Sequence, residues 1–223
     1  MFDKYLDDYY KNKSVKEICL KLGISQTTFN RKLREQNIPN RRSFLKLIDT
    51  GNADLNQTLK TKYMSIVNRC NGKSTDKYGH YNGMDYVKVY EWVEFCNDNK
   101  ELLLQMWDVY KNSGKLKYAI SVDRIDDSNG YLIRNMQFVF HGFNSWKKSL
   151  NPISVLHDGK TDYFMGFEEA SRHYGLRGQS IGESYAKTKY RIKGYDVEKI
   201  DYKEVLSHKD VSTLIEYYEK YIR

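Results

Sequence analysis

The sequence has few cysteines and no long apolar run, and each scarcity excludes a class of protein. The three cysteines, Cys19, Cys70 and Cys96, lie far apart with no C-x-x-C pair, which excludes a zinc ribbon and a disulfide framework. No stretch approaches the roughly 20 apolar residues of a membrane-spanning helix, so no membrane partner is expected. The N-terminal segment lacks the apolar core of a secretory signal, so we expect a protein of the cytoplasm.

Prolines are also scarce: the sequence has two, Pro39 and Pro152, and both stand between patterned segments. Proline disfavours helical geometry in the residue before it, so joints are expected there. The segments predicted on this basis are residues 1–45, a linker at 46–57, a central segment at 58–151, a module at 152–200 and a C-terminal helix within 201–223.

Basic residues are in excess, with 37 Lys and Arg against 29 Asp and Glu, a formal net charge of +8. Aromatic residues make up 14% of the chain, too many for a disordered one. Residues 1–45 hold ten basic and five acidic residues, more than half of the excess. A basic folded chain most often meets a polyanion such as nucleic acid, although a solvated surface explains the charge equally well.

Residues 14–35 have the pattern of two short helices around a tight turn. Ser14 and Glu17 have the S-x-x-E spacing of a capping box, while Gly23 and Ser25 are suited to end one helix and begin the next. This is the pattern of a helix-turn-helix, whose second helix enters the DNA major groove; an ordinary helical hairpin is the alternative. The side chains expected to read DNA are Gln26, Thr27, Asn30, Arg31 and Arg34.

Residues 167–181 repeat this pattern at a constant offset of 152, with Gly175 falling on Gly23 and Ile181 on Phe29. The sequence therefore predicts a second helix-turn-helix head. Two short strands around an Asp158-Gly159 turn are expected just before it. Residues 172–193 contain a basic cluster that can follow a phosphate backbone, and Glu183 is the one acidic residue among them. The cluster consists of Arg172, Arg177, Lys187, Lys189, Arg191 and Lys193.

The central segment predicts helices over 58–70 and 91–109, followed by a strand-turn-strand-helix unit. The strands are expected within 118–127 and 131–140, the turn at 128–130, and the helix at 141–150. The chain as a whole is thus expected to be α+β, with a central ββα unit and mostly helical flanking modules. Residues 203–223 predict one amphipathic tail helix.

Three polar residues of the ββα unit suggest a metal site. Asp123 lies on the first strand and Asn144 on the helix, so a carboxylate and an amide oxygen can share one hard divalent cation such as Mg²⁺. Asn135, between them, is well placed to hydrogen-bond the backbone and fix the hairpin. Hairpin chemistry alone is the alternative, because Asp and Asn are common in turns.

The run SVDRIDDSNGYLIRNMQFVFHGFNSWKKS resembles the ββα-metal motif of HNH endonucleases, closest to a phage and intron-associated group with a D-R-I-D sequence. The upstream string YMSIVNRCNGKSTDKYGHYNGMDYVKVYEW is similar to that group's lead-in. Flanking helix-turn-helix or modular DNA-binding repeats are typical of HNH homing endonucleases. The resemblance implies that Asp123 and Asn144 bind Mg²⁺ or Mn²⁺, that Asn135 is the central structural Asn, and that Lys147, with Lys148 beside it, contacts phosphate.

The chain departs from the family at Arg124, where most HNH nucleases have a histidine as general base. Arginine stays protonated, so it cannot activate water, but it can clamp the scissile phosphate. Several alternatives remain open for the missing base: a tyrosine acting with Arg124, a histidine, direct activation of water by the metal, or an inactive site. The candidate side chains are Tyr81, Tyr78, His80 and His141.

Together these features predict a site-specific, metal-dependent endonuclease of double-stranded DNA, encoded by a phage and acting in the bacterial cytoplasm. With one ββα unit per chain, a monomer would nick, and a weak homodimer on DNA would cut both strands. The rival interpretation, which Arg124 keeps open, is a DNA-binding regulator with a degenerate HNH fold.

Overall fold

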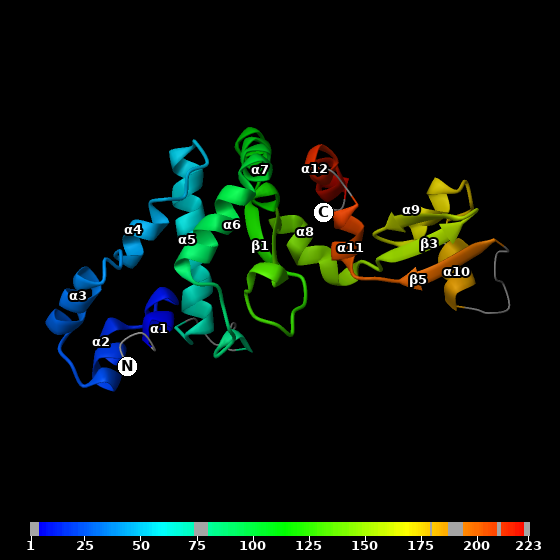
Figure 1. Cartoon of the computed structure of the whole chain (residues 1–223). Coiled ribbons are helices and arrows are strands. Elements are labelled where there is room, and N and C mark those ends of the chain that lie inside the picture. Colours follow the sequence, from blue (N-terminus) through cyan, green and yellow to red (C-terminus); the bar gives the residue numbers. More distant parts are fainter. Residues whose placement is uncertain (1–4, 74–79, 179, 187–193, 209–210, 221–223) are drawn as a thin grey trace. The chain divides into compact units, whose positions relative to one another are not determined.

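The fold is described from a computed structural model (Figure 1), which places residues 5–73, 80–178, 180–186, 194–208 and 211–220. The protein is of mixed α and β structure. The chain forms two units, one of residues 1–114 and 120–139, the other of residues 115–119 and 140–223. Within the described ranges, no helix is both long enough and apolar enough to cross a bilayer.

The first unit begins with three helices that form the first head. They are α1 (Leu6–Tyr10), α2 (Val15–Leu22) and α3 (Gln26–Glu35). The Ser14 hydroxyl accepts from the Glu17 amide at the start of α2, and Gly23 ends that helix with a φ of 64°. The Ser25 hydroxyl accepts from the Thr28 amide at 3.1 Å and begins α3. The turn predicted from these caps is confirmed.

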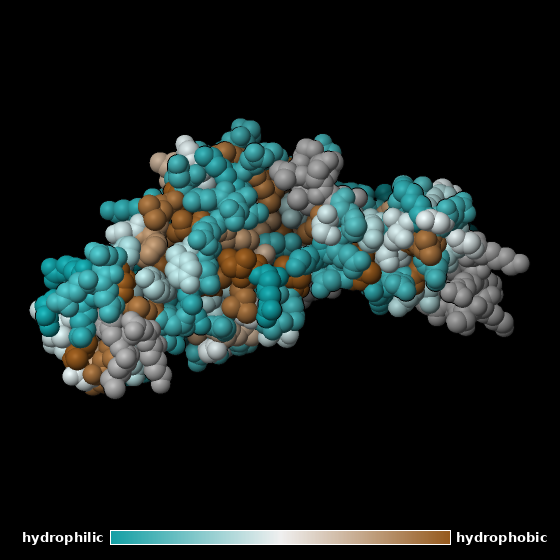
Figure 2. All heavy atoms as spheres, in the orientation of Figure 1, coloured by the Kyte–Doolittle hydropathy of each residue, from teal (hydrophilic) through white to brown (hydrophobic). Residues whose placement is uncertain are grey.

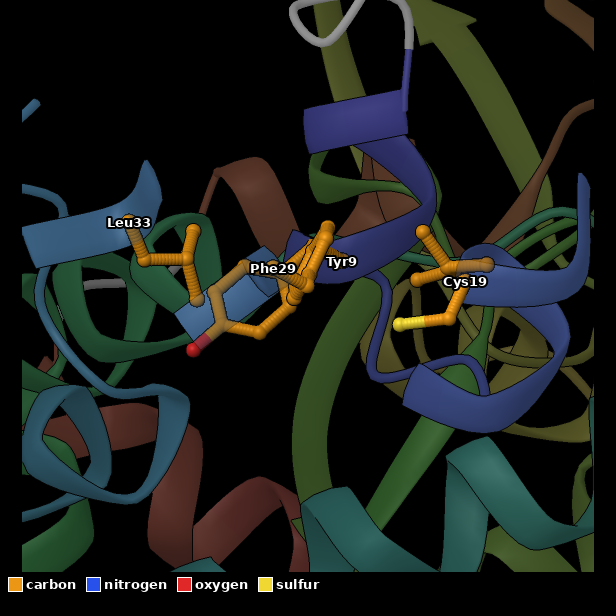
Figure 3. Packing of buried hydrophobic residues seen from close by; sticks show 5 residues of the cluster. Tyr9, Cys19, Phe29 and Leu33 are labelled. Atoms are coloured by element: carbon orange, nitrogen blue, oxygen red, sulfur yellow. The ribbon is translucent and has the colours of Figure 1, made fainter. Parts of the chain in front are cut away.

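A small apolar core holds the three helices of the first head together. The Tyr9 ring of α1 meets the Phe29 ring of α3 edge-on, with centroids 5.6 Å apart. Figure 3 shows these two rings between Leu33 and Cys19. Because α1 completes this core, the first head is a three-helix structure, whereas the sequence pattern indicated two helices.

Four further helices follow in the first unit: α4 (Arg41–Leu45), α5 (Ala53–Cys70), α6 (Val89–Asp98) and α7 (Lys100–Ser113). The prediction of a single helix over 91–109 is wrong, because the chain breaks at Asn99. There the Asn99 side chain donates to the Phe95 carbonyl at 2.8 Å, an interaction that competes with the helical ladder. Asn52 caps α5 by accepting from the Leu55 amide at 3.0 Å, so this helix begins five residues earlier than expected.

Strands β1 (Ile120–Arg124) and β2 (Met136–Phe140) form a two-stranded sheet, with a 3₁₀ turn, η4 (Ile133–Asn135), before β2. Both strands are shorter than predicted. Phe138 of β2 packs on the α6 rings of Trp92 and Phe95, at centroid distances of 5.8 and 4.7 Å. Trp92 also stacks on Tyr63 of α5 at 5.9 Å, so this aromatic core attaches the hairpin to α5 and α6.

The second unit contains a three-stranded antiparallel sheet of order β4-β3-β5, where the sequence predicted a two-stranded hairpin. The strands are β3 (Ile153–His157), β4 (Lys160–Phe164) and β5 (Tyr195–Lys199). Asp158 and Gly159 both have positive φ, 49° and 76°, in the two-residue turn that pairs His157 with Lys160. The hairpin turn is confirmed. The added strand β5 was missed.

The helices of the second unit begin with η3 (Leu116–Tyr118) and α8 (His141–Trp146), which is followed by η5 (Lys147–Ser149). After the hairpin come α9 (Phe167–His173), α10 (Ser180–Ala186), α11 (Tyr202–Ser207) and α12 (Val211–Lys220). The single tail helix predicted over 203–223 is wrong, since α11 ends at Ser207 and the His208 amide closes it onto the Val205 carbonyl.

The two heads share their turn at the level of individual hydrogen bonds. The Ile24 amide donates to the Cys19 carbonyl at 3.1 Å, and at the offset of 152 the Leu176 amide donates to the Ser171 carbonyl at 2.7 Å. The glycine between them has a φ of 64° in the first head and 65° in the second. The predicted repeat is therefore present in the backbone of both turns.

Candidate functional site

Asp123 lies on β1 and is 2% exposed. Its Oδ2 accepts a hydrogen bond from Gln137 Nε2 of β2 at 3.0 Å. Burying a carboxylate costs free energy because the charge loses its water, and a nearby cation offsets that cost. Since consecutive residues of a strand point to opposite faces, the side chain of Arg124 leaves β1 on the other side.

Arg124 is 5% exposed and organises the loop that follows β1. Its Nη1 donates to the carbonyl oxygens of Asp127 and Asn129 at 2.8 and 2.9 Å, and Nη2 lies 3.5 Å from the Asp127 carboxylate. Nη1 also lies 3.0 Å from Met84 Sδ. The guanidinium thus donates its hydrogen bonds mainly to backbone carbonyls of the loop.

Asn135 closes the same loop from the side of β2. Its Oδ1 accepts from the Asp126 amide at 2.8 Å, and its Nδ2 donates to the carbonyls of Asp126 and Gly130 at 3.0 and 2.8 Å. All three bonds go to backbone groups of the loop, and the side chain is 7% exposed. These are the backbone bonds that the sequence predicted for this residue.

Two arginines and two tyrosines form a cluster beside the loop; Arg69, Tyr81, Arg124 and Tyr131 are here called the Tyr–Arg cluster. The guanidinium carbon of Arg124 lies 4.6 Å from the Tyr81 ring centroid and 5.4 Å from that of Tyr131. The corresponding distances from Arg69 are 5.4 and 5.3 Å. The two rings stack with centroids 6.0 Å apart. The structure therefore brings Tyr81 and Arg124 together, as the hypothesis of joint action requires.

The other candidate acid–base groups near this cluster differ in accessibility. The exposed ring of His80 lies 4.0 Å from the Tyr81 ring centroid. Burial raises the pKa of Tyr131 far above its ordinary value, so this phenol stays neutral. Burial also raises the pKa of the Cys70 thiol to about 11, which makes a thiolate nucleophile unfavourable. Tyr78 lies outside the described residues.

The remaining residues of the predicted metal and phosphate site belong to the second unit. His141 is exposed at the start of α8, and Asn144 is half-buried on the same helix. Lys147 is 9% exposed, with its ammonium 5.5 Å from the Tyr202 ring centroid, whereas the Lys148 side chain lies outside the described residues. Because Asp123 belongs to the first unit, its pairing with Asn144 stays a prediction from sequence.

The DNA-reading face predicted for α3 is exposed. Gln26, Thr27, Asn30, Arg31 and Arg34 are all exposed, while Phe29 and Leu33 are buried beneath them. Figure 2 shows hydrophilic atoms, drawn teal, over this part of the surface. Arg31 forms a surface ion pair with Glu35 at 2.9 Å. Such pairs are worth little, so this arginine can exchange its partner for a phosphate or a base at small cost.

The second head presents fewer of its predicted DNA contacts within the described ranges. Arg172 and Arg177 are exposed, and Arg172 pairs with Glu168 at 3.1 Å. Lys187, Lys189, Arg191 and Lys193 lie outside the described residues.

Two residues of the Tyr–Arg cluster, Arg69 and Tyr131, had no predicted role. Both stood inside the stretches that resemble the family, Arg69 in the upstream string just before Cys70 and Tyr131 directly after the turn at 128–130. The two residues are 62 positions apart, and no pattern in the sequence indicates that their side chains come into contact. Among the described residues, no group of three or more His, Cys, Asp or Glu side chains is arranged to hold a metal.

Comparison of the chain with protein-family models, with curated proteins and with solved structures found no match. Motif and local geometry are therefore the grounds for a functional interpretation.

Proposed function

We propose that the protein is a metal-dependent, site-specific endonuclease that hydrolyses or nicks a phosphodiester bond of double-stranded DNA. In the family that the motif resembles, such enzymes include the homing endonucleases of phages. On this proposal the protein would act in a bacterial cytoplasm, as a monomer or weak homodimer on DNA. The observation that carries the proposal is the buried carboxylate of Asp123 on a hairpin whose loop is closed by Asn135.

The chemistry of the residues fits a hard divalent cation. Mg²⁺ and Mn²⁺ prefer carboxylate and amide oxygens together with water and phosphate oxygens. Asp123 would be the carboxylate ligand, and the motif assigns Asn144 as the second. A bound cation would supply Lewis-acid stabilisation of the phosphate, which neither residue provides by itself.

The helix-turn-helix heads would supply the recognition of DNA. In this motif the first residues of the second helix contact base edges in the major groove. Gln26, Thr27 and Asn30 occupy that position in α3 and are exposed. Arg31 and Arg34 add positive charge on the same helix. A recognition helix therefore favours double-stranded DNA as partner over RNA, whose deep, narrow major groove does not admit a helix.

A plasmid-nicking assay tests the proposal. Supercoiled plasmid and phage DNA are incubated with the purified protein in Mg²⁺ or Mn²⁺, and with EDTA as a control. The Asp123→Asn variant keeps the size of the side chain but removes the charge, so nicking should fall at least 100-fold while gel-shift binding persists. The matched control is Asp108→Asn, an exposed carboxylate of α7, which should nick at the wild-type rate. Equal nicking by Asp123→Asn and wild type would refute the metal role of Asp123.

One observation favours the second candidate, a DNA-binding regulator with a degenerate HNH fold. Arg124 stands where the family has its general base, and its guanidinium is buried against loop carbonyls. On that interpretation the wild type shifts DNA in a gel but nicks neither plasmid nor phage DNA with Mg²⁺ or Mn²⁺.

A further inference from the structure

The two arginines of the Tyr–Arg cluster differ in their access to solvent. Arg124 is 5% exposed and donates to two loop carbonyls, whereas Arg69, in the last turn of α5, is only half-buried. Tyr81 is half-buried as well, and Tyr131 is 2% exposed. A ligand approaching the cluster from solvent therefore meets Arg69 and Tyr81, and Arg124 and Tyr131 lie beneath.

The cluster concentrates positive charge at a surface position. Both guanidinium groups lie within 5.4 Å of the same Tyr81 ring. Two like charges held in one small region repel, and an anion placed beside both is attracted by both. The aromatic faces hold the guanidinium planes by cation–π contact, which limits the rotamers that Arg69 has to give up on binding.

The Arg69 side chain is also aimed by its own helix. Its Nε donates to the Ser65 carbonyl one turn earlier at 3.2 Å. This bond engages Nε, and the two terminal nitrogens carry the paired donors of the guanidinium fork. A planar fork with paired donors is the geometry that matches a phosphate group.

We propose that Arg69, held against the Tyr81 ring, binds a phosphodiester group of the DNA backbone. Arg124 is then a positioning residue that adds charge from beneath and holds the loop. This inference rests on the proposed function in taking DNA as the ligand, and it moves the phosphate contact that the sequence assigned to Arg124 onto Arg69.

The salt dependence of DNA binding measures this contact without any cleavage. A fluorescently labelled duplex of about 20 base pairs is titrated with protein in EDTA over a series of KCl concentrations. Each phosphate contact contributes about 0.9 to the slope of log affinity against log salt. We expect Arg69→Gln to reduce the magnitude of the slope by about one unit, as for loss of a single contact, and Arg69→Lys to retain it.

The charge control is Lys111→Gln, an exposed lysine of α7 that lies against Trp107, outside the cluster. This variant loses the same unit charge as Arg69→Gln. Because Lys111 lies outside the cluster, its slope should stay within experimental error of wild type. Arg124→Gln should lower the urea midpoint of unfolding because it breaks buried hydrogen bonds, whereas Arg69→Gln should not. A slope for Arg69→Gln equal to that of Lys111→Gln would overturn the inference.

The failures of the two proposals are distinguishable. If the wild type nicks no DNA but Arg69→Gln lowers the salt slope, the phosphate contact is supported and the nuclease is not. If the wild type nicks DNA and Arg69→Gln has the wild-type slope, the nuclease stands and Arg69 is only a packing residue. If both proposals hold, Arg69→Gln should also nick at least tenfold more slowly at subsaturating DNA.

Discussion

Replacing Asn135 with alanine tests how much of the candidate site depends on one amide. The change removes three hydrogen bonds of 2.8, 3.0 and 2.8 Å to the backbone of residues 126 and 130. A hydrogen bond of this kind contributes about 1 kcal/mol net to stability. Its loss costs more where the remaining partner stays buried and cannot bind water. The loop residues around Asp126 are exposed, so water can replace part of each bond. We therefore expect Asn135→Ala to lower the free energy of unfolding by about 3 kcal/mol.

Urea denaturation followed by tryptophan fluorescence measures this loss, since Trp92 and Trp107 both lie in the first unit. The control is Asn129→Ala, which removes an exposed amide of the same loop that bonds the Asp126 carboxylate. It should cost less than about 1 kcal/mol, because the carboxylate regains water. If Asn135→Ala proves no less stable than Asn129→Ala, Asn135 does not hold the loop and the reasoning fails.

Three further predictions concern a close approach, a turn and an ion pair. Gly130→Ala should lower stability by about 3 kcal/mol in urea, because an added Cβ would overlap the Asp85 carbonyl oxygen. Gly175→Ala should lower it by about 1 kcal/mol, and the thermal midpoint with it, because the residue has a φ of 65° and alanine disfavours that conformation. Hydrogen bonding by Lys160 holds the pKa of Asp162 below its ordinary 3.8, so the wild type should lose stability as the pH falls below about 4. Asp162→Asn should show a smaller loss over that acid range.

The first head and the central helices share one unit, although the sequence indicated a linker between them at 46–57. Within that segment Ile48 and Thr50 are buried, at 2% and 1% exposure. Lys88 of the central segment pairs with Asp7 of the head at 2.6 Å, and Lys11 pairs with Asp85 at the same distance. A reading helix held in this way would position DNA relative to the loop after β1 more precisely than a tethered one would.

In the second unit, Glu169 connects the second head to the last helix. Its carboxylate accepts from the Met165 amide at 2.8 Å and from the Tyr217 hydroxyl at 2.9 Å, and it pairs with Lys220 at 2.8 Å. Tyr218 of the same helix packs on Phe143 of α8, with centroids 5.1 Å apart. The last helix therefore contacts both α8 and α9.

Local features of the chain were predictable from the sequence by itself. The first head's turn follows from Ser14, Gly23 and Ser25, whose side chains or permitted φ act within a few residues. The second head follows from the same turn at an offset of 152, and the β3–β4 hairpin follows from Asp158-Gly159. The hydrogen bonding of Asn135 was also predictable, since its partners lie nine residues or fewer away.

Only the tertiary structure decided which distant residues meet and how accessible they are. Arg69 and Tyr131 lie 62 positions apart, yet their side chains share one cluster because aromatic packing attaches the β1–β2 hairpin to α5 and α6. The strand β5 likewise forms only by pairing with β3, which lies far earlier in the chain. Sequence periodicity records which face of an element is apolar, but long-range packing determines which element covers that face. The sequence pointed to Arg124 as a clamp for the scissile phosphate, whereas the fold buries Arg124 and leaves Arg69, which had no predicted role, half-buried.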